Sequence, residues 1–240
     1  MKKLSIYVFP ILILLVSCKE EAKKPKVIYE DVKAVVAPLK KDSAQIKITD
    51  LPIQIEGTSF LIHPMGEYSL TDGSSKVSSS SSYDKDESFK VSNYNDYEIT
   101  GYISNFKFQK IGSDSLQLLT DKPILIQTAT YLKTVSDKTK QQVLVYTLSD
   151  MDTNKDGKIN SNDIKTLYLS DISGDKFTKI SADFQELIDW NLIESTNRLY
   201  FRTIEDINKN GAFDKTDKVH YHFVNLQNKD WKVEEYSPIN

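Results

Sequence analysis

Short apolar runs alternate with polar turns along most of this chain. From Tyr97 onward the runs are rich in β-branched and aromatic residues. Each run is flanked by turn-forming residues, namely Gly, Asn, Asp, Ser or Pro. This pattern predicts β-strands, because such side chains favour a pleated surface and strands need only about four to eight residues. The composition agrees, with 13 tyrosines and 10 phenylalanines in 240 residues. We therefore predict an all-β fold.

An internal repeat organises these runs. The segment 167–181 aligns without gaps with 221–235 and with 106–120. Each copy contains an apolar strand, a small or amide turn and a second strand, which is the pattern of a β-hairpin. A further pair of apolar runs precedes the hairpin, so that a unit has four strands. These preceding pairs are 122–132 with 141–150, and 186–194 with 198–206.

Four antiparallel strands that recur every 54 to 61 residues are typical of a propeller blade with inserts. The stretch LYLSDISGDKFTKIS at 167–181 also resembles the WD40-like repeats of TolB-type β-propellers. This resemblance implies a small or incomplete β-propeller-like fold. Two units are clear, a third is weaker, and a degenerate fourth could occupy 57–100. The alternative to a closed propeller is an open, stacked array of sheets.

Two polar loops of twelve residues occupy the same place in the repeat. DTNKDGKINSND (152–163) and DINKNGAFDKTD (206–217) start 54 residues apart, each between strand-like runs. Clustered carboxylates and amides favour a hard cation such as calcium, which takes six to eight oxygen ligands. Both loops resemble the EF-hand loop, which supplies ligands from positions 1, 3, 5, 7, 9 and 12. The resemblance implies Asp152, Asn154, Asp156, the Lys158 carbonyl, Asn160 and Asp163 in the first loop, and Asp206, Asn208, Asn210, the Ala212 carbonyl, Asp214 and Asp217 in the second.

Other positions of the loops also match, with one departure. Gly157 and Gly211 stand at position 6, where the chain turns sharply. Position 12 is Asp in both loops instead of the usual Glu, as in dockerin-like calcium loops, and the shorter side chain lowers affinity. Because the flanks are strand-like, we predict two calcium sites in EF-hand-like loops grafted into β-hairpins. The alternative is a polar turn without an ion. Apolar residues at position 8, expected to pin each loop to the core, are Ile159 and Phe213.

The N-terminus carries a separate signal. Lys2-Lys3 precedes an apolar run over 4–16, which is too short to span a membrane and has the length expected in a signal peptide. The sequence Leu15-Val16-Ser17-Cys18 then resembles the lipobox of bacterial lipoproteins. This resemblance implies a signal peptide over 1–17 and acylation of Cys18, the single cysteine of the chain, with palmitate-like chains. The alternative is an ordinary secretory signal with an incidental cysteine.

Residues 18–50 are predicted to be a tether between the lipid and a β-repeat domain over 51–240. The tether is rich in Lys, Glu and Ala, and a short helix is expected near 29–36. Lys19-Glu20-Glu21 resembles the surface-export signal of Bacteroidota lipoproteins, which implies an outer-membrane protein that faces the cell surface. The periplasmic face of that membrane is the alternative. A serine-rich run at 73–88 is predicted to be a loop.

Charge and motifs exclude several classes of function. The formal charge is −3, and removal of 1–17 takes two lysines away to leave −5. The chain has no basic stripe, which argues against nucleic-acid binding. No nucleophile elbow or phosphate loop is present, so no catalytic residue is assigned. His220 and His222 share one strand face and are expected to be an exposed pair, while Trp190 and Trp231 are expected in the core.

Together these features predict a lipid-anchored, calcium-binding protein of the cell envelope. We expect it to act as a non-enzymatic binding or scaffold module, with the membrane as one partner and an envelope protein or a glycan as another. An accessory subunit of an envelope complex is an alternative, and a hydrolase with an unrecognised site is another. A propeller-like fold does not decide between them, because such folds host many functions.

Overall fold

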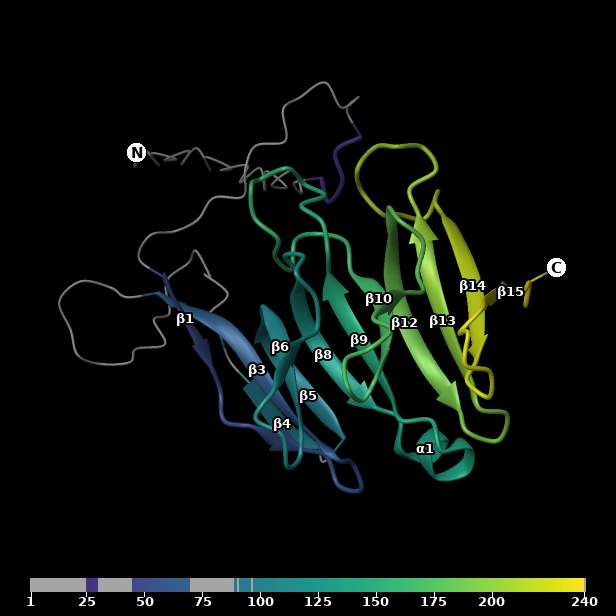
Figure 1. Ribbon diagram of the computed structural model, residues 1–240. Coiled ribbons are helices and arrows are strands. Elements are labelled where there is room, and N and C mark those ends of the chain that lie inside the picture. Colours follow the sequence, from purple (N-terminus) through teal and green to yellow (C-terminus); the bar gives the residue numbers. More distant parts are fainter. Residues whose placement is uncertain (1–24, 30–44, 70–88, 90, 96, 240) are drawn as a thin grey trace, which may run out of the picture.

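A computed structural model describes residues 25–29, 45–69, 89, 91–95 and 97–239. In this part of the chain the strands form three antiparallel sheets that pack face to face (Figure 1). The first sheet has the order β1-β3-β6-β7, with β2 paired to β3. Its strands are β1 (Gln45–Thr49), β2 (Ile53–Gln54), β3 (Phe60–Ser69), β6 (Asn105–Lys110) and β7 (Leu116–Leu118).

The central sheet has six strands and the last sheet has four. Their orders are β11-β10-β9-β8-β5-β4 and β12-β13-β14-β15. A short helix, α1 (Lys133–Thr139), connects β8 to β9 where the sequence predicted only a connection. The strands of the central sheet are β4 (Val91–Asn95), β5 (Glu98–Ile103), β8 (Leu125–Tyr131), β9 (Val143–Ser149), β10 (Thr166–Asp171) and β11 (Thr178–Lys179). Those of the last sheet are β12 (Gln185–Ile193), β13 (Arg198–Glu205), β14 (Lys218–Asn225) and β15 (Val233–Glu235).

The central sheet is buried on both faces, and this explains why β9 is its most apolar strand. Successive side chains of a strand point to opposite faces. In β9, Leu144 and Tyr146 lie in the core shared with the first sheet, while Val143 and Val145 lie in the core shared with the last sheet. A strand covered on both sides therefore reads as a continuous apolar run. The buried Tyr146 hydroxyl is satisfied by the Ser170 hydroxyl at 2.7 Å.

The predicted blade-like repeat and the all-β fold class are confirmed. The three aligned segments coincide with the hairpins β6–β7, β10–β11 and β14–β15, one in each sheet. Phe106 and Leu167 occupy equivalent positions and are both buried against the following sheet. Their equivalent in the last sheet is Tyr221, which is half-buried in an aromatic cluster on the outer face. Trp231 lies in the second core with Trp190 against it, as expected.

The expected fourth unit at 57–100 is wrong. Strand β3 belongs to the first sheet, whereas β4 and β5 cross to the edge of the central sheet beside β8. The crossing is favourable because Ile99 and Ile103 then enter the first core. This insert joins β3 to β6, the same connection that carries the polar loops in the other two units.

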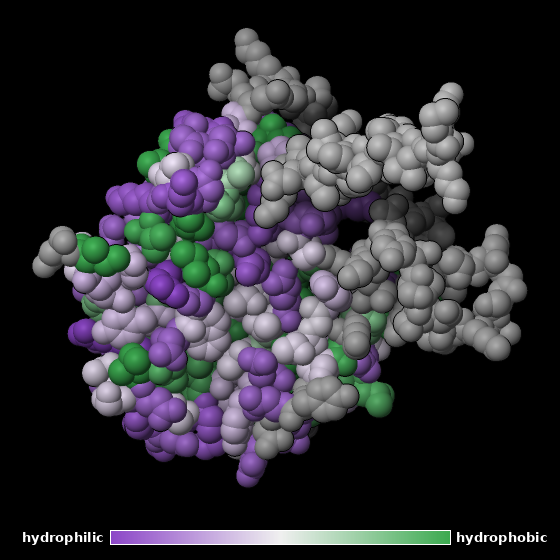
Figure 2. Space-filling view, turned by 180° about the vertical axis from the view of Figure 1, so that it is seen from behind, coloured by the Kyte–Doolittle hydropathy of each residue, from purple (hydrophilic) through white to green (hydrophobic). Residues whose placement is uncertain are grey.

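Several predicted features lie outside the described residues. They are the signal peptide over 1–17, Cys18, the expected helix beyond Tyr29, and the loop at 73–88. Strand β1 begins at Gln45, within the segment predicted as tether. In the described part of the chain, no helix is long and apolar enough to cross a membrane. Figure 2 shows that hydrophobic side chains on the face seen from behind form small patches among polar ones.

Candidate calcium-binding loops

Each polar loop leaves its own sheet at the equivalent place in the repeat. The first joins β9 to β10 after the pair Leu148–Thr166, and the second joins β13 to β14 after the pair Glu205–Lys218. Each therefore connects the second and third strands of a unit, and both lie at one end of the molecule (Figure 1). The repeat thus places two chemically similar loops next to each other.

The first loop is held by hydrogen bonds from its own backbone to its predicted ligands. The Oδ1 and Oδ2 atoms of Asp152 accept the N–H groups of Asp156 at 3.1 Å and Gly157 at 2.8 Å. Asn154 Oδ1 also accepts the Asp156 N–H, at 3.0 Å. Asp156 Oδ1 accepts the Lys158 N–H at 2.9 Å. The side chains at positions 1, 3 and 5 are thus gathered within the loop.

The second loop repeats this pattern at every equivalent position. Asp206 accepts the N–H groups of Asn210 at 3.2 Å and Gly211 at 2.7 Å. Asn208 Oδ1 accepts the Asn210 N–H at 2.9 Å, and Asn210 Oδ1 accepts the Ala212 N–H at 2.8 Å. The two loops thus share these hydrogen bonds although their side chains differ at most other positions. The shared bonds are made by the side chains at positions 1, 3 and 5.

Backbone angles at two positions agree as well. Lys155 and Lys209, at position 4, have φ of 57° and 56°. Gly157 and Gly211, at position 6, have φ of 85° and 82°. Glycine adopts a φ of 82–85° without steric cost because it lacks a Cβ atom, which accounts for the residue at position 6. The position 8 residues Ile159 and Phe213 are half-buried, so they shield the loops only in part.

The two loops differ at position 12. Asp163 is fully buried, and its carboxylate accepts the N–H groups of Thr153 at 2.8 Å and Asn160 at 2.8 Å. Burial raises the pKa of the Asp163 carboxyl, against the lowering effect of these hydrogen bonds. Asp217 accepts the Asp214 N–H at 2.8 Å through Oδ2, but its Oδ1 is buried without a hydrogen-bond partner. A buried carboxylate oxygen without a partner is costly, and a cation would satisfy it.

Carboxylates alone do not form a metal cluster here. Within the described residues, no three His, Cys, Asp or Glu side chains come together as a metal-binding group. The predicted rings differ from such a cluster because they also use amide side chains and the backbone carbonyls of Lys158 and Ala212. The donor set is entirely oxygen, which fits calcium better than zinc.

A short N-terminal segment, residues 25–29, crosses both loops, and we name it the strap. The N–H groups of Lys26 and Val27 donate to the Gly211 carbonyl at 2.7 and 3.3 Å. The Ile28 N–H donates to the Thr153 carbonyl at 2.9 Å, and the Thr153 hydroxyl donates to the Lys26 carbonyl at 2.9 Å. Val27 is only 2% exposed. The strap therefore binds both loops, and Lys26 alone contacts the second loop through its N–H and the first loop through its carbonyl.

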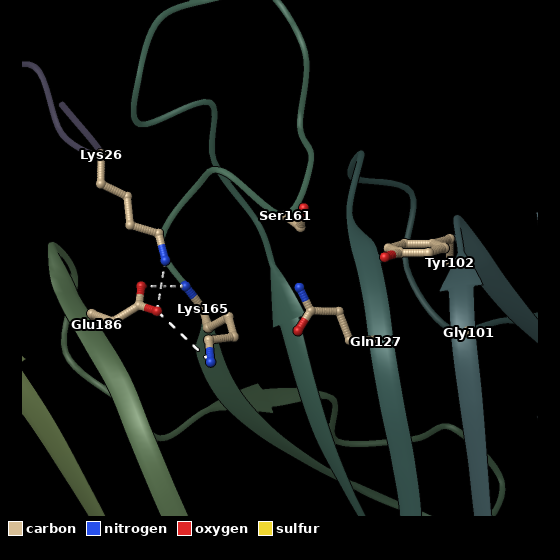
Figure 3. A pocket seen from close by; sticks show the side chains of 7 residues that line it. All are labelled: Lys26, Gly101, Tyr102, Gln127, Ser161, Lys165 and Glu186. Carbon is tan, nitrogen blue, oxygen red and sulfur yellow. Dashed lines mark hydrogen bonds and ion pairs between the residues drawn. The ribbon is translucent and has the colours of Figure 1, made fainter. Parts of the chain in front are cut away.

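Side chains of the strap add two further contacts. Lys26 Nζ lies 2.7 Å from Glu186 Oε1 on β12, and Glu186 Oε2 accepts the Lys165 N–H at 2.9 Å (Figure 3). Burial raises the pKa of Tyr29 to about 12, and the negative charge of the nearby Asp206 carboxylate adds to this effect. The Lys26–Glu186 pair borders an open polar cleft of about 570 Å³. The other residues that line this cleft are Gly101, Tyr102, Gln127, Ser161 and Lys165.

Sequence reasoning missed the strap because charged residues surround it. Its one signal is the apolar triplet Val27-Ile28-Tyr29 in a segment otherwise rich in Lys and Glu. Composition alone assigns such a segment to a solvated tether. Three consecutive apolar residues are too few to show a helical or strand period.

The histidine pair is not exposed, contrary to the prediction. The His220 side chain is 11% exposed and lies between Glu205 Oε2 at 2.7 Å and Glu235 Oε1 at 3.3 Å. His222 stacks on the Phe201 ring, and burial lowers its pKa. Both rings occupy the face of the last sheet that carries the second core, since His222 pairs with Phe201 across β13 and β14.

Comparison with known proteins adds no relative. No protein-family model, curated protein or solved structure matches the chain. The conclusion on function therefore rests on the residues of the two loops and on the N-terminal sequence.

Proposed function

We propose that this protein is a calcium-binding module of the cell envelope, anchored to the outer membrane by a lipid on Cys18. It acts as a binding or scaffold module and not as an enzyme. The N-terminal motif supports the anchor, and Lys19-Glu20-Glu21 supports exposure at the cell surface. The calcium sites are supported by the two equivalent loops, 152–163 and 206–217.

One observation carries the calcium assignment. The loops share the same hydrogen bonds at positions 1, 3 and 5, and the second leaves Asp217 Oδ1 buried and unpaired. A bound calcium ion would neutralise the acidic side chains and give that oxygen a partner. The residues that would hold it are Asp152, Asn154, Asp156, Lys158, Asn160 and Asp163 in the first loop, and Asp206, Asn208, Asn210, Ala212, Asp214 and Asp217 in the second.

Calorimetric titration of the full chain in detergent tests this assignment. We expect two calcium ions per chain with dissociation constants of about 0.1 to 1 mM, the range of extracellular calcium modules. Asp217→Asn should remove or weaken one site by at least about tenfold, because it removes charge at the unpaired oxygen. Asp114→Ala, an exposed aspartate outside both loops, is the matched control and should bind two ions. Absence of binding at millimolar calcium would refute the proposal.

The anchor gives a prediction of its own. Cys18→Ser should move the protein from the membrane pellet to the soluble fraction after a carbonate wash, because acyl chains hold it there. Fractionation with an antibody against the domain measures the change. Protease added to intact cells should digest the wild-type protein if it faces the surface. Retention of the serine variant in the pellet would contradict the lipid anchor, and full protection from protease would place the protein on the periplasmic face.

A further inference from the structure

We propose that the strap is a shared part of both calcium sites, and that it docks only when the loops hold calcium. This inference rests on the proposed function. It assigns the strap residues as positioning residues, which touch the loops without being ligands themselves. Its consequence is that calcium in one loop affects the affinity of the other.

The strap binds backbone groups that stand beside predicted ligands. The Thr153 carbonyl, which accepts the Ile28 N–H, belongs to the residue after Asp152. The Gly211 carbonyl, which accepts two strap N–H groups, belongs to the residue before Ala212. In the loop conformation described above, both carbonyls point at the strap and accept its N–H groups. A loop that loses this conformation therefore loses its strap contacts.

The packing between strap and loop is too close to tolerate a different loop shape. A Cβ atom on Gly211 would lie 2.5 Å from the Val27 carbonyl oxygen and 2.8 Å from Pro25 Cβ. Tyr29 of the strap also lies near Asp206 at position 1, since that carboxylate contributes to the raised pKa of the tyrosine. At the other end Lys26 is held by Glu186 (Figure 3). The strap thus recognises the ordered state of the second loop and is anchored beside the first.

Sharing of the strap couples the two sites. The first ion to bind orders one loop and the strap residues that contact that loop. The second ion then orders a loop whose binding partner, the strap, is already in place. This second step costs less conformational entropy than the first. The result is positive cooperativity, and by linkage each site must favour the other equally.

Docking also limits the distance between the domain and the anchor. Pro25 lies seven residues after Cys18, so a docked strap holds the loops within at most about 25 Å of the anchor. When the strap is released, the maximum distance is set by the first strand, which begins at Gln45, 27 residues from Cys18. The distance between the domain and the anchor can then rise to about 95 Å. Calcium would therefore bring the loop end of the domain towards the membrane.

Limited proteolysis of the full chain in detergent tests the docking. Trypsin can cut the Lys26–Val27 bond, which lies inside the strap. We expect calcium to slow this cut by at least about tenfold relative to chelator in the wild-type protein. Ile28→Pro removes the N–H that donates to Thr153 and should abolish the protection, whereas Ile28→Val keeps that N–H and should behave as wild type. Calcium titration should show two ions bound to Ile28→Pro, without cooperativity and about fivefold more weakly, as expected for one lost hydrogen bond.

The outcomes separate this inference from the proposed function. If the wild-type protein binds no calcium, the proposed function fails. If it binds two ions but Ile28→Pro keeps the same affinity and the same protection, only the strap inference fails. Equal cutting of the wild-type strap with and without calcium also overturns it, and this comparison needs no variant.

Discussion

Chelation of calcium should lower the melting temperature of this protein by roughly 6–20 °C while the far-UV spectrum at low temperature stays typical of β-structure. An ion that binds only the folded state adds about 1.4 to 2.7 kcal/mol at a ten- to hundredfold excess over its dissociation constant. Two ions therefore add about 3 to 5 kcal/mol, and each kcal/mol shifts the midpoint by about 2–4 °C in a domain of this size. The sheets persist without calcium because both cores lie away from the loops.

Substitution of the aspartate at position 1 of each loop should show how much that loop contributes to the calcium-dependent change in melting temperature. Asp152→Ala and Asp206→Ala should each remove part of the calcium-dependent shift, and the double variant should remove nearly all of it. The difference between calcium and chelator is the relevant quantity, because both aspartates also accept backbone hydrogen bonds that the alanines lose. Asp114→Ala should keep the full shift, and magnesium should replace calcium poorly, since it requires a tighter octahedron. A double variant that still shows the full shift would place calcium elsewhere.

Truncation of one leucine on each face of the central sheet should cost about 2 to 5 kcal/mol of unfolding free energy per site. Leu144 is 1% exposed in the first core, and Leu167 is 0% exposed in the second. Alanine at either position removes apolar contacts and leaves a cavity between two sheets. The side chains lie in separate cores, so the two losses should add within about 0.5 kcal/mol.

Leu116 provides a control with the same chemistry. It lies on β7 and is 48% exposed, so Leu116→Ala should change the unfolding free energy by less than about 0.5 kcal/mol. Urea unfolding followed by tryptophan fluorescence measures the wild type, the three single variants and the Leu144→Ala/Leu167→Ala double variant, because Trp231 lies in the second core. A loss below about 1 kcal/mol for Leu144→Ala and Leu167→Ala would show that the three sheets are not packed as described.

The position of the two polar loops within β-hairpins has a mechanical consequence. In an EF-hand the loop joins two helices, whereas here each loop joins two strands paired in register. Movement of the flanking strands would break ladder hydrogen bonds and expose a core, so an opening of the EF-hand type is excluded by the sheet. The parts that the sheet leaves free to move are the loop itself and whatever binds to it. The strap is the segment that does so.

The loops could be predicted from sequence because their requirements are local. Position 6 needs a positive φ and is therefore glycine, and the side chains at positions 1, 3 and 5 bond to backbone groups within about five residues. The strands and the repeat were equally accessible, since apolar spacing reflects burial. Residues 167–181 and 221–235 thus align by sequence and form equivalent hairpins in the structure.

Contacts between distant segments were decided by the tertiary structure alone. β4 and β5 cross to the central sheet because that sheet offers a free edge to pair with and a core that can bury their side chains. No local sequence pattern encodes that choice. The burial of His220 and His222 was likewise decided by the tertiary structure. The alternation of side chains along a strand shows that the two histidines share a face of the sheet, but it does not show which face is covered. The strap is the strongest case: five residues in a charged segment, 25–29, are fixed by carbonyls more than 120 residues away in the chain. A sequence specifies its local turns through neighbouring residues, while such long-range docking depends on surfaces that exist only after the sheets have packed.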